Sequence, residues 1–141
     1  LAPPVPWAQR GVALPAAAWW VGLPVGALVT GVLVIDDIRD RGWDAQKGWR
    51  TTPVRFGLAG SRAESAALMA FAYAVPPVMV AAGWSAAVLL PLLTAPWAWR
   101  AWQAVRRFDD TPSLFPWTPR VAKLGLAYAA LQALGLALSR G

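Results

Sequence analysis

Two long stretches without a charged side chain constrain this chain more than any other feature of its sequence. Residues 11–35 form the first, which is 25 residues long, and residues 65–99 form the second, which is 35 residues long. A helix needs about 20 apolar residues to cross the hydrocarbon core of a bilayer, which is about 30 Å thick. The first stretch therefore predicts one membrane-spanning helix, at residues 16–35, and the second has room for a pair.

The second stretch is divided by Gly83, which predicts a tight hairpin of two helices, at residues 61–82 and 85–103. The charged side chains at their outer ends can snorkel toward the membrane surface. A fourth span is predicted at residues 120–138, which are apolar except for Arg120, Lys123 and Gln132. We expect an all-α, polytopic transmembrane helix bundle with four spans, kinked at prolines such as Pro76, Pro77 and Pro91.

The composition supports a membrane protein. Hydrophobic residues make up 57% of the chain and charged residues only 14%, whereas soluble domains have about a quarter of their residues charged. The charged residues that give the net charge of +6 are concentrated in short segments, which argues against the evenly basic surface of a nucleic-acid binder. The absence of Cys and His excludes disulfides, zinc sites of the usual ligands and nucleophilic triads with a His base.

The basic residues predict how the chain is oriented. They are concentrated in segments 36–62 and 100–120, and the positive-inside rule places such segments on the cytoplasmic side. We therefore expect a multi-pass protein, of a bacterial inner membrane, with loop 36–62 cytoplasmic. The chain begins with Leu and has Met only at positions 69 and 79, so we also expect it to be part of a longer protein.

The acidic residues are gathered in one place. Four of the seven, Asp36, Asp37, Asp40 and Asp44, fall within nine residues. Their spacing by three and four places all of them on one face of a helix that continues out of the membrane. Like charges so arranged repel one another, so a compensating cation is expected. Carboxylates without His or Cys suit Mg²⁺, which proteins commonly hold with one or two carboxylates and the phosphates of a substrate.

Basic side chains follow the same acidic residues. Arg39, Arg41, Lys47, Arg50 and Arg55 supply the donors that bind a diphosphate. Acidic and basic residues together predict a clamp for a polyanion and its metal ion. The alternative is a solvated loop in which Asp and Arg side chains only pair with one another, and such exposed pairs contribute little.

The same segment resembles the second aspartate-rich motif of the UbiA superfamily of intramembrane prenyltransferases. Within that superfamily it is similar to the 1,4-dihydroxy-2-naphthoate polyprenyltransferases of menaquinone synthesis. The resemblance is carried by Asp36-Asp37-Ile38-Arg39-Asp40, Asp44, Gly48-Trp49-Arg50-Thr51 and Val54-Arg55-Phe56-Gly57. Residues 22–30 and 113–124 also resemble that family. Asp36-Asp37 replaces a pair that is often Asn-Asn, and Trp49 stands where Lys is usual.

The resemblance implies a fold and an activity. The fold is the C-terminal part of a nine-helix bundle. The activity is Mg²⁺-dependent transfer of an isoprenyl chain from an allylic polyprenyl diphosphate to an aromatic acceptor, in the synthesis of menaquinone or a related quinone. The first aspartate motif of that family is absent, so we expect these 141 residues alone to be inactive.

The resemblance also implies roles for residues of the charged segment. Asp40 and Asp44 are the expected catalytic residues, Asp36 and Asp37 join them as metal ligands, and the substrate diphosphate is expected on Arg39, Lys47 and Arg50.

Two other classes of membrane protein also combine apolar helices with charged loops. The CDP-alcohol phosphatidyltransferases also depend on several aspartates, but their D-G-x-x-A-R core is missing here. A transporter or non-catalytic membrane protein with a charged cytoplasmic loop stays open as the alternative function.

Overall fold

The computed structural model describes the backbone of residues 16–139 and the side chains of residues 18–139. Its α-helices are α1 (Ala16–Gln46), α2 (Thr52–Ala81), α3 (Ala95–Arg107) and α4 (Trp117–Ser139). Two 3₁₀ segments complete the chain, η2 (Ala86–Thr94) before α3 and η3 (Thr111–Leu114) before α4. The all-α class expected from the sequence is confirmed.

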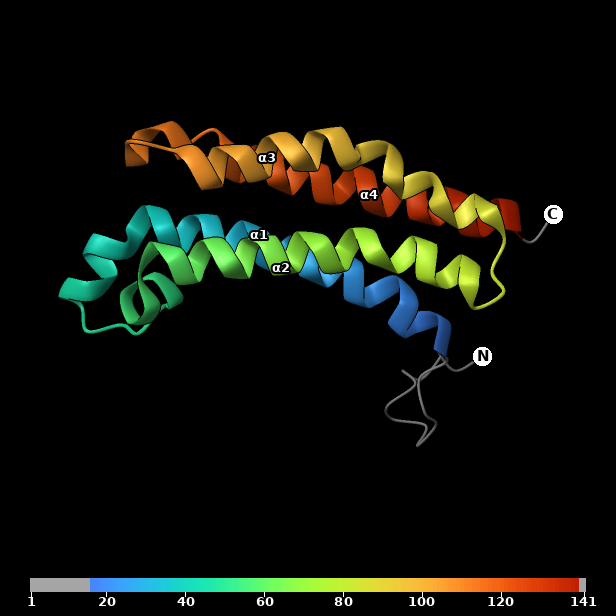
Figure 1. Ribbon diagram of the computed structural model, residues 1–141, viewed down its shortest axis with the longest axis horizontal. Helices are drawn as coiled ribbons and strands as arrows, with labels where there is room; N and C mark the ends of the chain where they lie inside the picture. The colour runs from blue at the N-terminus through green and yellow to red at the C-terminus, as the bar shows by residue number, and fades with distance from the viewer. Residues whose placement is uncertain (1–15, 140–141) are drawn as a thin grey trace, which may run out of the picture.

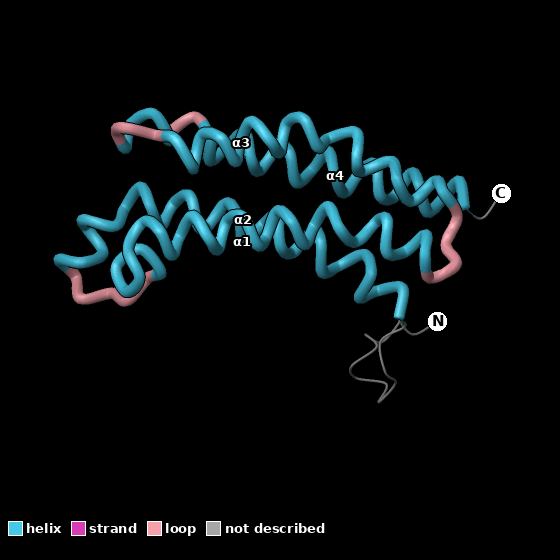
Figure 2. Tube along the Cα trace, in the orientation of Figure 1, coloured by secondary structure: helices cyan, strands magenta, loops and turns pink. Residues whose placement is uncertain are grey.

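The helices form an elongated bundle. Figure 1 shows α1 and α2 side by side as one pair. The continuous segment η2–α3 and helix α4 form a second pair, which lies along the first. Figure 2 shows how short the connections are, so each helix runs antiparallel to the one before it. As a result, the turn after α1 and the connection after α3 lie at one end of the bundle, here called the charged end. The turn after α2 lies at the other end.

Three helices, α1, α2 and α4, are long and apolar enough to cross a membrane. The third span expected from the sequence, at residues 85–103, has a different construction. It begins as the 3₁₀ segment η2, which contains Pro91, and continues directly into α3 up to Arg107. A proline cannot donate an N–H to the α-helical ladder, and 3₁₀ geometry is a common local adjustment near such a residue.

Segment 36–62, expected as a loop, is mostly helical in the structure. Helix α1 continues past Ile35 to Gln46, and α2 begins at Thr52, so only a short turn joins them. Gly48 in this turn has a φ of 75°, and Gly57 breaks α2 into two pieces with a φ of 70°. Both values favour glycine because a Cβ would be strained there. Helix α1 therefore carries the aspartates on a regular helical frame, as their spacing predicted.

A few polar side chains join the helices inside an otherwise apolar core. The hydroxyl of Tyr128 on α4 donates a 2.5 Å hydrogen bond to the carbonyl of Ala72 on α2. Tyr73 shares a 2.6 Å hydrogen bond with Thr94 of η2, and the two tyrosine rings meet edge to face. In lipid there is no hydrophobic force between apolar helices, so packing and hydrogen bonds of this kind fix their register.

Helix α4 approaches η2 closely at Gly135. A Cβ at this position would collide with the backbone carbonyl of Ala87 in η2. By contrast, Gly22 and Gly26, whose spacing suits close helix packing, are exposed and have open space around them in the described residues. Within this bundle, η2 and α4 meet through Gly135 instead.

We expect Gly135→Leu to destabilise the bundle. The added side chain forces η2 away from α4, and overpacking of this kind costs about 1–3 kcal/mol. The apparent unfolding midpoint in an SDS titration of the purified protein should fall. Gly22→Leu, which enters open space, serves as the matched control and should leave the midpoint unchanged. Equal midpoints for Gly135→Leu and the wild type would contradict the close approach of η2 and α4.

Candidate functional site

The charged end of the bundle gathers residues from every helix. The last three turns of α1 carry the four aspartates, and the start of α2, the end of α3 and the start of α4 lie at the same end of the bundle (Figure 1). Two contacts fix this arrangement. Thr118 at the start of α4 donates a 2.9 Å hydrogen bond to Asp36, and Arg41 of α1 donates a 3.2 Å hydrogen bond to Thr111 of η3.

The end of α3 is held by two arginines that approach the ring of Phe108. Arg62 of α2 lies over that ring at 4.9 Å and donates a 3.0 Å hydrogen bond to the carbonyl of Val105. Arg41 of α1 lies over the same ring at 5.9 Å. Cation–π contacts of this type are individually modest. Together they connect α1, α2 and α3 next to the aspartates.

Arg39 forms ion pairs with two of the four aspartates. Its guanidinium lies 3.4 Å from Asp36 and makes two hydrogen bonds, of 3.1 and 3.2 Å, to the two oxygens of Asp40. Such a two-pronged contact is the strongest geometry available to an arginine and a carboxylate. The solvated Asp–Arg pairing considered from the sequence therefore exists, but it involves one arginine and two of the four acids.

The other two aspartates have a different environment. Asp44 is only 5% exposed, and Asp37 is half-buried. Among the side chains of residues 18–139, none forms an ion pair or a hydrogen bond with either carboxylate. Asp37 also lies close enough to Asp44, Asp36 and Asp40 to experience their negative charges. Burial of a carboxylate without a partner carries a cost that grows with the extent of burial, so a bound cation would be favoured at this position.

Glu64 is a site residue that the sequence reasoning missed. It lies on α2, its charge acts on Asp37 from the neighbouring helix, and its Oε2 is buried without a hydrogen-bond partner in the described part of the chain. In the sequence, Glu64 is the only acidic residue between Asp44 and Asp109. This isolated acidic residue next to an apolar stretch was the one sequence signal that could have identified it. Only the packing of α2 against α1 shows that Glu64 adds to the same negative region.

The basic residues expected to bind diphosphate occupy different positions. Arg39 is engaged by Asp36 and Asp40. Lys47 and Arg50 lie exposed in or beside the turn between α1 and α2, and the ammonium of Lys47 lies over the ring of Trp43 at 4.6 Å. Because Lys47 and Arg50 are exposed and lie beside negatively charged residues, they can contact an anion that binds together with a metal ion.

The donor set of this region fits a divalent cation that a substrate helps to bind. Within residues 16–139, no three acidic side chains are grouped closely enough to hold a metal by themselves. Mg²⁺ does not require such a group, because one or two carboxylates and phosphate oxygens commonly complete its coordination. One or two of the carboxylates of Asp37, Asp44 and Glu64 would provide protein oxygens, and the phosphates of a substrate would provide the rest.

Comparisons with curated proteins and with solved structures find no match. Among protein-family models, one described as the UbiA prenyltransferase family matches residues 1–136, which is almost the whole chain. The match agrees with the structure: a multi-pass bundle of apolar helices with an aspartate-rich helix end. This chain belongs to the UbiA prenyltransferase family.

Proposed function

We propose that the protein transfers an isoprenyl chain from an allylic polyprenyl diphosphate to 1,4-dihydroxy-2-naphthoate or a related aromatic acceptor in quinone synthesis. Family membership supports prenyl transfer to an aromatic ring. The motif at residues 36–57 supports the naphthoate acceptor and the menaquinone pathway. The observation that carries the proposal is the buried residue Asp44 at the charged end of the bundle, whose carboxylate has no ion-pair or hydrogen-bond partner among the side chains of residues 18–139 and whose negative charge acts on Asp37.

The reaction requires one bond to break and one to form. The C–O bond between the allylic carbon and the diphosphate breaks, and the diphosphate leaves with the electron pair. The resulting carbocation is attacked by an electron-rich ring carbon, and the ring then loses a proton. The negative charge that develops on the leaving oxygen must be stabilised by positioned cations in a site with little water.

The residues of the charged end match these needs. One or two of Asp37, Asp40 and Asp44 would hold Mg²⁺ together with phosphate oxygens of the substrate, with Asp36 at the edge of the set, and the metal would then offset the charge of the departing diphosphate. Lys47 and Arg50 would contact phosphate oxygens from the rim, and Arg39 would orient Asp36 and Asp40 through its ion pairs. Since Arg39 is already engaged, its contact with the diphosphate requires at least one of these pairs to open.

We also propose that these helices are the C-terminal part of the prenyltransferase domain. They carry one aspartate cluster, whereas the family resemblance implies two, with the diphosphate between them. Transfer therefore requires the rest of the domain. The family match argues against the transporter alternative, because its description is a transferase.

A transfer assay tests the proposed function. Membranes that contain the whole protein should convert a radiolabelled allylic polyprenyl diphosphate and 1,4-dihydroxy-2-naphthoate into a prenylated product. Monocyclic hydroxybenzoates should be poorer acceptors. Asp44→Asn should lower the rate by about a hundredfold or more, since one electrostatic contact to developing charge is commonly worth that much. It should not destabilise the protein, because it removes an unpaired buried charge.

Asp109→Asn is the matched control. It makes the same chemical change at an exposed aspartate in the α3–α4 connection, and the rate should stay at the wild-type value. Wild-type rates for Asp44→Asn would remove Asp44 from the site. Transfer to hydroxybenzoates in preference to the naphthoate would contradict the proposed acceptor.

The charged end is proposed to face the cytoplasm, since it carries the basic segments. The chain has no native cysteine, so single cysteines can report its orientation. Cysteines at Gln46 and Thr111, both at the charged end, should be protected from an impermeant thiol reagent in intact cells and labelled after permeabilisation. Ala82→Cys, at the opposite end, should be labelled in intact cells. The reverse labelling pattern would overturn this orientation.

A further inference from the structure

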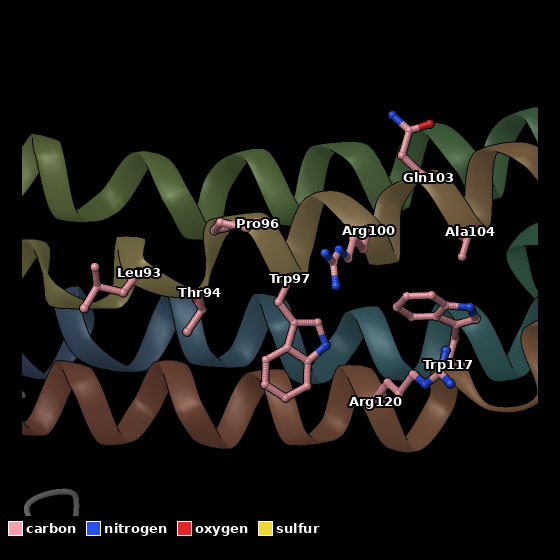
Figure 3. Close-up of a pocket in the computed structure, with 9 residues that line it drawn as sticks. All are labelled: Leu93, Thr94, Pro96, Trp97, Arg100, Gln103, Ala104, Trp117 and Arg120. Carbon is pink, nitrogen blue, oxygen red and sulfur yellow. The ribbon is translucent and has the colours of Figure 1, made fainter.

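A groove of about 1080 Å³ lies between the η2–α3 segment and α4, apart from the aspartates. This volume is slightly above the usual range for pockets that take small ligands, which is about 300–1,000 Å³. Figure 3 shows the side chains of Trp97 and Arg100 projecting from α3 toward α4, and Trp117 and Arg120 lying on the opposite side. The groove is therefore bordered by one arginine and one tryptophan from each of the two helices.

The groove changes from polar to apolar along its length. Arg100 and Arg120 lie toward the charged end of the bundle, where α3 finishes and α4 begins. Leu93 of η2 lines the opposite end, and it is 70% exposed. A ligand that filled the groove would thus have an anionic group at one end and hydrocarbon at the other.

The two arginines are available for such a ligand. Within the described residues 18–139, neither forms an ion pair with an acidic side chain. Arg120 lies over the ring of Trp117 at 4.9 Å, which limits the directions that its guanidinium can take. Guanidinium groups bind phosphate through paired hydrogen bonds, and tryptophans are common where a membrane protein meets the lipid headgroups.

We propose that this groove binds an anionic membrane phospholipid. Arg100 and Arg120 contact the headgroup phosphate, Trp97 and Trp117 flank it, and an acyl chain covers Leu93. Basic pockets between transmembrane helices are known to hold anionic headgroups, because the phosphate lies at the depth of the helix ends. The aspartate site needs a metal to accept an anion, whereas this groove accepts one directly. The inference does not rest on prenyl transfer.

Native mass spectrometry of the purified whole protein tests the proposal without an activity measurement. Delipidated protein is titrated with phosphatidylglycerol or phosphatidylcholine, and bound lipid is counted. We expect preferential binding of phosphatidylglycerol. The double variant R100Q/R120Q should weaken that binding by about twenty- to thirtyfold, since each basic residue near an anionic membrane surface contributes about a factor of five. R100K/R120K should retain part of the preference, because its charge is kept.

The double variant R106Q/R107Q is the matched control. It removes the same charge from exposed positions of α3 that do not line the groove, and phosphatidylglycerol binding should be unchanged. Equal loss in both double variants would contradict the proposal, since attraction would then depend on net charge alone. Binding of a polyprenyl diphosphate in place of the phospholipid would assign the groove to substrate. A groove that binds no lipid, because another part of the protein covers it, would also overturn the proposal.

Discussion

Helix α1 carries four aspartates on one face where it extends beyond the membrane, and their negative charge must be compensated by positive charge. This requirement determines which residues gather at one end of the bundle. Arg39 supplies that charge to Asp36 and Asp40 from the same helix. Asp37 and Asp44 have no such partner among residues 18–139, and α2 brings Glu64 to the same region instead of a cation. The protein scaffold therefore leaves negative charge in place, which is the arrangement expected where a metal ion and a phosphate anion bind together.

The frame around this charge is held by polar contacts that are few but well distributed. Arg62 and Arg41 meet at Phe108, Thr118 holds Asp36, and Tyr128 joins α4 to α2 in the middle of the bundle. Hydrogen bonds and cation–π contacts gain strength where water is scarce. These contacts fix the relative positions of the helices, because apolar surfaces alone would allow one helix to shift along another. A site on such helices keeps its geometry better than one on loops.

The sequence predicted the features that depend on local pattern. The uncharged stretches predicted apolar helices, and the spacing of Asp36, Asp37, Asp40 and Asp44 predicted one helical face. Features that depend on packing between helices were not predictable. Three features require the neighbouring helix: the 3₁₀ segment η2 at the start of the predicted third span, the contact of Gly135 with Ala87 and the approach of Glu64 to Asp37. The predicted span at residues 16–35 covers only the apolar part of α1, because lipid sets how far a helix must be apolar and not where it ends.

The most direct test of the unpaired carboxylates is the binding of Mn²⁺, which takes the same oxygen ligands as Mg²⁺. Electron paramagnetic resonance measures free Mn²⁺ as purified protein is titrated in the presence of inorganic diphosphate. The wild-type protein should bind Mn²⁺ more tightly than Asp44→Asn by about tenfold or more, because the loss of groups that hold or support a metal commonly costs that much. Asp109→Asn should bind like the wild type. Equal affinity for Mn²⁺ in the wild type and in Asp44→Asn would show that the charge at this end of the bundle does not serve a metal.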